Sequence, residues 1–138
     1  MELFVVSPAF VDAAWADGAN TLAEATKWAD REITADQLKM LLARGERVLL
    51  GMREGIEKPM AWAAVQVQQL PNIRCLYVYA IVAHNSTGAE QFEKLKEYAK
   101  ANGCTTIRGA CSDSIGRLWE RKLDAKKLYA IYEIEVNT

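Results

Sequence analysis

The chain has 138 residues, of which 51% are apolar by type and 25% are charged, and its formal net charge is −1. These values are close to the averages for soluble globular proteins, and the length suits one domain of ordinary size. Apolar residues run through the whole sequence, which excludes a disordered chain. Near-zero net charge gives no general attraction to nucleic acid or to an anionic membrane, so we expect neither as a partner.

Three cysteines and one histidine provide little material for a metal site. No two cysteines have CxxC spacing, and a zinc site would require nearly all of these residues to converge, so we expect no metal. Residues 1–6 are too short and too acidic for a signal peptide, and the odd number of thiols indicates reduced cysteines. The longest apolar run, residues 75–83, is well short of the roughly 18 residues that span a membrane. We therefore expect a cytoplasmic protein.

The first third of the chain predicts one strand followed by helices. Residues 3–6 form a short apolar run typical of a buried strand, and the pair Ser7-Pro8 resembles a helix N-cap followed by proline. Capping-box spacing, with Thr three residues ahead of Glu or Gln, occurs at residues 21–24 and again at residues 34–37. Each predicts the start of a helix.

Three strands are expected next, over residues 47–53, 60–70 and 74–83. Short turns join them, which favours an antiparallel meander. The third strand is apolar on both faces, so we expect helices to cover both sides of the sheet.

The last third returns to alternating elements. An amphipathic helix is expected over residues 88–102, a strand over 104–111, a helix around residues 115–123, and a closing β-rich run over 127–136. A helical crossover between the strands at 74–83 and 104–111 predicts that they are parallel.

The resulting order is β-α-α-β-β-β-α-β-α-β, in one domain over residues 1–138. The predicted fold class is α/β (α+β), with a mixed, mostly antiparallel central sheet flanked by helices.

This layout resembles the GNAT (Gcn5-related N-acetyltransferase) superfamily over essentially the whole chain, most strongly over residues 76–125. In that family the fourth strand parts from the fifth, and the pantetheine arm of coenzyme A enters the wedge between them. The pyrophosphate binds backbone N–H groups at the start of the following helix, where the helix dipole favours an anion. The resemblance implies acetyl-CoA as cofactor, strands four and five at residues 74–83 and 104–111, and a pyrophosphate turn at residues 84–89.

The family's turn reads Gln/Arg-x-x-Gly-x-Gly/Ala, and it falls here on residues 83–88 or, one later, on 84–89. In either register only the last position matches, and the turn carries no arginine. Asn85, Ser86 and Thr87 are also good helix-capping residues without any ligand. The resemblance implies cofactor contacts from two segments, namely Ile81, Val82, Ala83, His84, Asn85, Ser86, Thr87, Gly88 and Ala89, and from Ser114.

Many family enzymes use a tyrosine as general acid in the fourth helix, and Trp119 stands at that position here. Indole has no proton that dissociates near neutral pH, so core packing is the expected role of Trp119. Tyr79 and His84 are the candidate catalytic residues. Tyr77 and Tyr79 share one face of their strand, where sheet packing or an acceptor pocket would suit them, and His84 is the only histidine, at the mouth of the expected wedge.

Two functions follow from the resemblance. The first is an N-acyltransferase that moves acetyl from acetyl-CoA to an amine of a small molecule or a protein, mainly by positioning and backbone N–H stabilisation. The second is a GNAT-fold binding or assembly protein, of a kind that bacteriophages also encode, without acetyltransferase activity. A homodimer built through residues 127–136 is a further expectation, because that strand would form a sheet edge.

Overall fold

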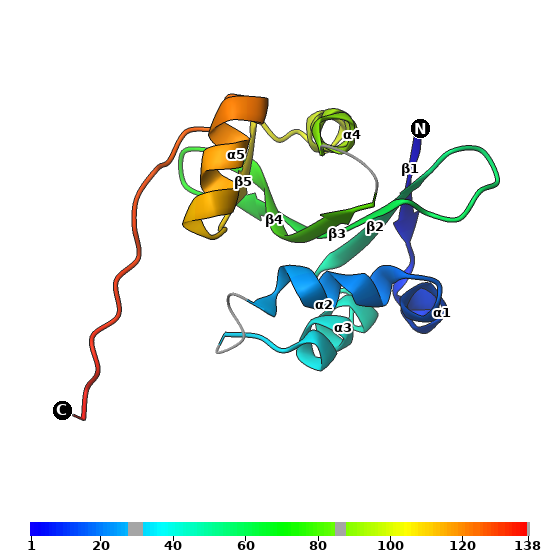
Figure 1. Ribbon diagram of the computed structural model, residues 1–138, viewed down its shortest axis with the longest axis horizontal. Coiled ribbons are helices and arrows are strands. Elements are labelled where there is room, and N and C mark those ends of the chain that lie inside the picture. The colour runs from blue at the N-terminus through cyan, green and yellow to red at the C-terminus, as the bar shows by residue number, and fades with distance from the viewer. Residues whose placement is uncertain (28–31, 85–87, 138) are drawn as a thin grey trace.

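The computed structural model describes residues 1–27, 32–84 and 88–137 (Figure 1). A five-stranded sheet in the order β1-β2-β3-β4-β5 runs through the middle of the molecule. The strands are β1 (Glu2–Val6), β2 (Val48–Arg53), β3 (Ala61–Gln69), β4 (Arg74–Ala83) and β5 (Thr106–Gly109). The helices are η1 (Pro8–Phe10), α1 (Val11–Ala16), η2 (Ala19–Thr21), α2 (Leu22–Ala25), α3 (Ala35–Ala43), α4 (Ala89–Ala101) and α5 (Asp113–Leu123).

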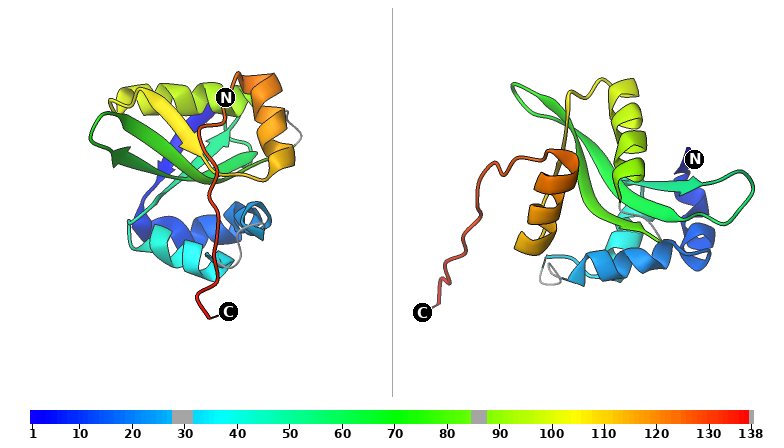
Figure 2. Two further views of the ribbon diagram at one scale, coloured as in Figure 1. Left: turned by 90° about the vertical axis from the view of Figure 1, so that its left-hand side faces the viewer. Right: turned by 45° about the horizontal axis from the view of Figure 1, so that its top comes forward.

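The sheet is mixed, as the sequence predicts. The pairs β1–β2, β2–β3 and β3–β4 are antiparallel, and the crossover through α4 makes β4 and β5 parallel. Both faces are covered by helices (Figures 1 and 2): α4 and α5 lie on one side, and α1, α2 and α3 on the other. The predicted α/β class and the helical cover on both faces are confirmed.

Two apolar clusters fill the spaces between the sheet and its helices. The cluster under α4 and α5 includes Leu50, Val65, Leu76 and Leu95. The cluster under α1–α3 includes Leu22, Leu38, Leu49 and Trp62. Burying such side chains stabilises the fold by roughly 1.5–3 kcal/mol each relative to full exposure, so both layers hold the sheet.

One predicted capping box forms and the other does not. At the start of α3, the Thr34 hydroxyl accepts from the Gln37 N–H at 3.3 Å, and the Thr34 N–H donates to Gln37 Oε1 at 2.9 Å. Thr21 instead donates its hydroxyl proton to the carbonyl of Gly18, 2.7 Å away, and it is itself in a helical conformation. The short helices η2 and α2 follow each other without a break, so Thr21 has no N-cap role.

The expected closing strand over residues 127–136 is wrong for this chain. No strand is assigned to those residues, and they are exposed to solvent. Figures 1 and 2 show this segment leaving the end of α5 and running away from the sheet. Its β-branched and aromatic residues favour an extended backbone, but a strand also requires a neighbour to complete its hydrogen bonds.

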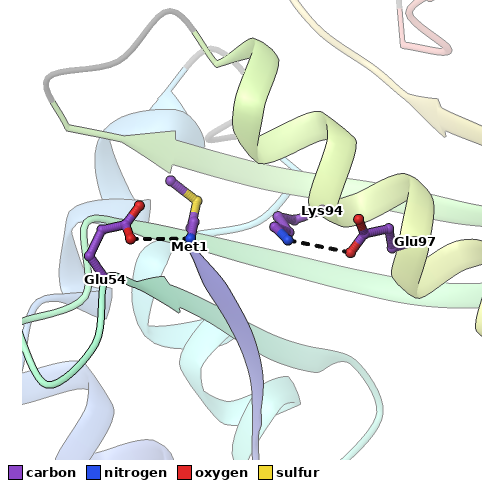
Figure 3. A network of polar contacts seen from close by, with 4 residues as sticks. All are labelled: Met1, Glu54, Lys94 and Glu97. Carbon is purple, nitrogen blue, oxygen red and sulfur yellow. Dashed lines mark ion pairs between the residues drawn. The ribbon is translucent and has the colours of Figure 1, made fainter.

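The chain begins beside the α4 layer. The Met1 ammonium lies 3.1 Å from the Glu54 carboxylate, and Lys94 lies 3.5 Å from Glu97 along α4 (Figure 3). Partly exposed ion pairs of this kind contribute little stability, about 0–1 kcal/mol each. Across the described residues, no helix has both the length and the apolar character to cross a membrane.

Candidate functional site

A β-bulge in β4 marks the centre of the site. Ala64 of β3 lies opposite Ala80, but the next residue, Val65, lies opposite Val78, so Tyr79 is an extra residue with no partner on β3. The bulge changes which side chains face α4 and α5. On the N-terminal side of the bulge, Val78 lies on the face covered by α4 and α5. On the C-terminal side the next residue on that face is Ile81, three residues later instead of two. A bulge of this kind bends a strand and often lies next to an active site.

β4 and β5 separate at the same point. Their pairing runs from Cys75 opposite Thr106 to Val78 opposite Gly109 and stops there. β4 continues to Ala83 without a described strand on that side, so the backbone N–H and C=O groups that β4 directs to this side beyond Val78 have no strand partner among the described residues; we call this edge the wedge. An unpaired strand edge is a surface on which an extended ligand can make main-chain hydrogen bonds.

Gly109 and Trp119 form the closed end of the wedge. A Cβ atom on Gly109 would lie 3.1 Å from the Val78 carbonyl oxygen and 3.4 Å from Cζ3 of Trp119. The indole also packs edge-to-face on Phe92 of α4, with ring centroids 5.6 Å apart. Trp119 therefore packs in the core, as expected from its residue type, at the point where the two strands part.

The β4 residues expected to hold coenzyme A have their side chains on both faces of the sheet. Ile81 and Ala83 pack against the cluster under α4 and α5, whereas Val82 packs against the opposite cluster. His84 follows with an exposed side chain, and its N–H donates to the carbonyl of Met60 at 2.8 Å.

The expected pyrophosphate turn is described only in part. Asn85, Ser86 and Thr87 lie outside the described residues. Gly88 is the N-cap of α4 in the left-handed region at φ 87°, and Ala89 is the first helical residue, partly exposed. Positive φ at the N-cap suits glycine, and the N–H groups of the first helical turn form an anion-binding surface.

On the other face of β4 lies an open pocket of about 400 Å³. It reaches the place where β4 and β5 part, because Val78, Tyr79 and Ala110 contribute to its wall. Tyr77 of β4 also lines it. The remainder comes from the α2–α3 region and from the residue that precedes β2, and includes Thr26, Glu32, Gln37, Met40, Leu41 and Arg47. The pocket and the wedge therefore meet at Tyr79 from opposite sides of the sheet.

Two tyrosines and an arginine form a cluster in the wall of this pocket. The Tyr79 hydroxyl donates to Gln66 Oε1 at 2.8 Å and accepts from Gln68 Nε2 at 3.2 Å. The guanidinium carbon of Arg47 lies 3.4 Å from the centroid of the Tyr79 ring, and the Tyr77 ring lies 4.7 Å from Tyr79. Sequence and structure agree that Tyr77 and Tyr79 share a face.

Burial raises the pKa of Tyr77 above the ordinary tyrosine value. The neighbouring Tyr79, Tyr129 and Glu32 raise the pKa further, while Arg47 lowers it. The Tyr77 phenol is therefore protonated across the neutral range and has a proton to donate.

Ser114 lies in the first turn of α5. Its hydroxyl is 3.3 Å from that of Ser112, the N-cap residue whose side chain accepts from the Ile115 N–H.

Nearby, the pKa of the half-buried Cys111 thiol is raised by burial and by Asp113 and Glu120, so Cys111 is a poor nucleophile at neutral pH. The described residues contain no group of three or more metal-ligating side chains.

Comparison with solved structures identifies the fold. A ribosomal-protein-alanine N-acetyltransferase from Brucella melitensis biovar Abortus 2308 matches with a TM-score of 0.69 and 15% identity, covering 98% of this chain and 99% of that one. An aminoglycoside acetyltransferase from a soil metagenomic sample, solved with sisomicin, matches with a TM-score of 0.63 and 8% identity over 99% of this chain and 96% of that one. The BH1408 protein of Bacillus halodurans matches with a TM-score of 0.65 and 12% identity over 99% and 100%.

The protein thus has the GNAT fold, in a divergent form. Neither a family model nor a curated protein matches the sequence. At 8–15% identity the similarity to these three structures lies in the fold.

Sequence reasoning missed Arg47, Glu32 and Gln37 as pocket residues. Nothing local marks them, because each belongs to a segment far from β4 in the sequence. The signal that was available is the pair Tyr77 and Tyr79 on one face of a strand that is otherwise apolar.

Proposed function

We propose that this protein is an N-acetyltransferase that binds acetyl-CoA in the wedge between β4 and β5 and takes its amine acceptor from the pocket on the opposite face of β4. The observation that carries the proposal is the coincidence of the bulge at Tyr79 with the end of β4–β5 pairing at Val78 and Gly109. This coincidence gives an extended thioester a free strand edge to bind, and it opens that edge toward a second pocket.

The residues present fit coenzyme A, although the expected pyrophosphate turn at residues 84–89 contains no lysine or arginine. The backbone of Ile81, Val82 and Ala83 offers hydrogen bonds to the pantetheine arm, and His84, Gly88 and Ala89 lie where the pyrophosphate would meet the start of α4. Asn85, Ser86 and Thr87 are proposed to complete that turn, and Ser114 to contact the cofactor from α5. Without an arginine in the turn, binding is expected to be about tenfold to a hundredfold weaker than with one.

Bound acetyl-CoA supplies the acetyl group as an activated thioester. The protein holds the two reactants in contact and directs backbone N–H groups of β4 beyond the bulge at the thioester carbonyl oxygen. Trp119 has no proton to give, so the departing sulfur must receive one from another group. We propose the tyrosines of the pocket, Tyr79 and its protonated neighbour Tyr77, for this role, and the solvent-exposed His84 as the route by which the amine loses its proton.

The acceptor is a small-molecule or protein amine. The protein is proposed to work in the cytoplasm, where the free thiols Cys75, Cys104 and Cys111 would stay reduced.

A pair of matched variants tests cofactor binding. Ala89→Glu places a carboxylate at the first residue of α4, where it stabilises the helix but repels a pyrophosphate. Ala35→Glu is the same change at the first residue of α3, equally half-buried and away from the wedge. Acetyl-CoA at a hundred times its Kd should stabilise the wild type by about 2.7 kcal/mol in a thermal unfolding assay.

We expect Ala35→Glu to keep that shift and Ala89→Glu to weaken acetyl-CoA binding by about tenfold or more, since 1.4 kcal/mol of repulsion suffices. No shift for the wild type at about 5 mM acetyl-CoA would overturn the proposal. Mass spectrometry of an amine panel then tests transfer. Binding without any acetylated product favours the alternative, a GNAT-fold binding protein that has lost catalysis, for which Trp119 at the general-acid position is the supporting observation.

A further inference from the structure

The guanidinium of Arg47 lies over the Tyr79 ring without a charged partner. Its carbon is 3.4 Å from the ring centroid, and the Arg47 side chain has no ion pair or hydrogen bond within the part of the chain that the structure describes. The side chain is half-buried in the wall of the pocket on the α1–α3 side of β4. A guanidinium held in this way keeps its N–H donors available for the oxygens of an anionic ligand.

One glutamine fixes both members of this stack. Gln66 Oε1 accepts from the Tyr79 hydroxyl at 2.8 Å, and Gln66 Nε2 donates to the carbonyl of Glu46, the residue before Arg47, at 3.1 Å. The Arg47 N–H donates to the carbonyl of Leu41, 3.4 Å away in the last turn of α3. The sheet and α3 thus position the guanidinium in advance, which lowers the entropy cost of binding a ligand.

The pocket contains one charge of each sign. Among its described lining residues only Arg47 and Glu32 are charged, and no ion pair joins them. Both charges act on the phenol of Tyr77, whose pKa is raised by Glu32 and lowered by Arg47, so both lie near that side chain. Because the two charges balance, the pocket favours a ligand with one carboxylate and one ammonium group over a dianion such as a phosphate monoester.

The rest of the described wall is largely apolar. Met40 is 47% exposed, and it lines the pocket together with Ile33, Leu38, Leu41, Val78 and Ala110. A volume of about 400 Å³ with this lining suits a small molecule that has an apolar chain.

We propose that this pocket binds a free amino acid with an apolar side chain, and that this amino acid is the amine acceptor. Its carboxylate binds the Arg47 guanidinium, Glu32 attracts its ammonium group, and its side chain lies against the apolar wall. A single carbon separates the carboxylate from the nitrogen, so a carboxylate held over Tyr79 keeps the amine beside the bulge. The role as acceptor rests on the proposed function, whereas the binding does not.

Acetyl transfer to such a ligand balances. The ammonium nitrogen gives up two protons and forms the amide bond to the acetyl carbon, while the carbon–sulfur bond breaks and its electron pair and one of the protons go to sulfur. The products are an N-acetylamino acid, coenzyme A and one released proton. The product no longer has an ammonium group for Glu32 to attract, which favours its release.

The first experiment measures binding of three matched amines, without and with about 1 mM coenzyme A. Leucine, leucinamide and 3-methylbutylamine share one side chain and one amine, and only leucine has a carboxylate. By calorimetric titration we expect leucine to bind at least tenfold more tightly than the other two. An affinity for leucine no greater than for leucinamide overturns the proposal, as does the absence of leucine binding at about 10 mM in both conditions.

Arg47→Gln removes the charge that distinguishes these ligands. The leucine-to-leucinamide ratio should fall to within about twofold. Arg44→Gln is the matched control, because Arg44 is exposed and paired with Glu46 at the surface, and it should keep the ratio of the wild type. An unchanged ratio in a folded Arg47→Gln variant overturns the proposal.

Glu32→Gln tests the other charge at an exposed position where folding should not suffer. We expect severalfold weaker binding of leucine and tighter binding of N-acetyl-leucine, which is an anion without an ammonium group. Glu57→Gln, in the turn between β2 and β3, is the control and should change neither affinity. Equal changes for the two ligands, or no change for either, overturn the proposal.

Transfer is then measured with acetyl-CoA and the same amines. The kcat/KM for leucine should exceed that for leucinamide by tenfold or more, with N-acetyl-leucine identified by mass spectrometry. Faster acetylation of leucinamide or 3-methylbutylamine supports an acetyltransferase but overturns the amino-acid acceptor. Leucine binding without any acetylated product supports the amino-acid site and contradicts the proposed function, so the two failures are distinguishable.

Discussion

The guanidinium of Arg47 lies 3.4 Å from the centre of the Tyr79 ring, so a residue that precedes β2 is stacked on the bulged residue of β4. The stacking joins two segments that are remote in sequence. It also fixes a positive charge at the wall of the pocket that we assign to the acceptor.

Arg47→Ala should therefore act on the acceptor and not on the cofactor. We expect the KM for the amine acceptor to change severalfold while the KM for acetyl-CoA stays within error, with a stability loss of about 0.5–1 kcal/mol from the lost cation–π contact. Steady-state kinetics with each substrate varied in turn measures the split. Arg44→Ala, which removes only a surface ion pair with Glu46, is the control and should change neither constant.

Gly109→Ala should destabilise the protein by roughly 1–3 kcal/mol, because its Cβ would press on the Val78 carbonyl and the Trp119 ring. Gly116→Ala is the matched control. Its Cβ would lie at an ordinary 3.5 Å from Cys111 Sγ, within α5, and alanine there should add roughly 0.5–1 kcal/mol. Urea unfolding of the two variants should thus shift in opposite directions, and a shift of both in one direction would contradict the packing described at the wedge.

Trp119→Phe should fold with a modest loss, whereas Trp119→Ala should cost about 2–4 kcal/mol, at or below the usual range for a buried aromatic because the indole is only partly buried. The contact with Phe92 is lost in the alanine variant and kept in part in the phenylalanine variant. Intrinsic fluorescence and calorimetry together check this. Equal losses in the two variants would show that the indole N–H, rather than the ring packing, holds Trp119 in place.

The raised pKa of Tyr77 predicts a loss of stability in alkali. Below about pH 10 the phenol is protonated in both states, so its contribution to the free energy of unfolding is complete. As the pH rises above that value the unfolded phenol ionises first, and stability falls until the pH passes the higher folded pKa. Urea unfolding at about pH 9 and about pH 11 should show a smaller decline for Tyr77→Phe than for the wild type. Some decline should remain in Tyr77→Phe, because the pKa of Tyr98 is also raised by burial and by Cys104.

The meander was predictable from sequence almost to the residue. The third predicted strand, residues 74–83, coincides with β4, and the second, 60–70, exceeds β3 by one residue at each end. Alternation and turn residues are local signals, and here tertiary contacts did not override them. The bulge was not predictable, because Tyr79 is an ordinary strand residue and no glycine marks it. The pocket was not predictable for a related reason, because Arg47 and Tyr79 are distant in sequence and come into contact only in the folded sheet.

The closing strand shows the opposite case. Residues 127–136 have the right composition for a strand, yet composition specifies only an extended backbone. A strand also needs a hydrogen-bonded neighbour, and among the described residues no strand pairs with this segment. Features that depend on pairing between distant strand edges are thus the part of this protein that local sequence predicts least well.

The unmatched residue in β4 has a consequence for how this protein tolerates changes in length. β4 has ten residues and β3 has nine, and the residue of β4 without a partner on β3 is Tyr79. Deleting Tyr79 would restore an even ladder with Ile81 and Val82 still in their present layers, but it would remove the unmatched residue that makes the bulge. A deletion in the turn at residues 54–59 would leave the bulge in place. The bulge therefore depends on the number of residues in β4: a substitution at Tyr79 keeps the extra residue, whereas the loss of one residue there removes it.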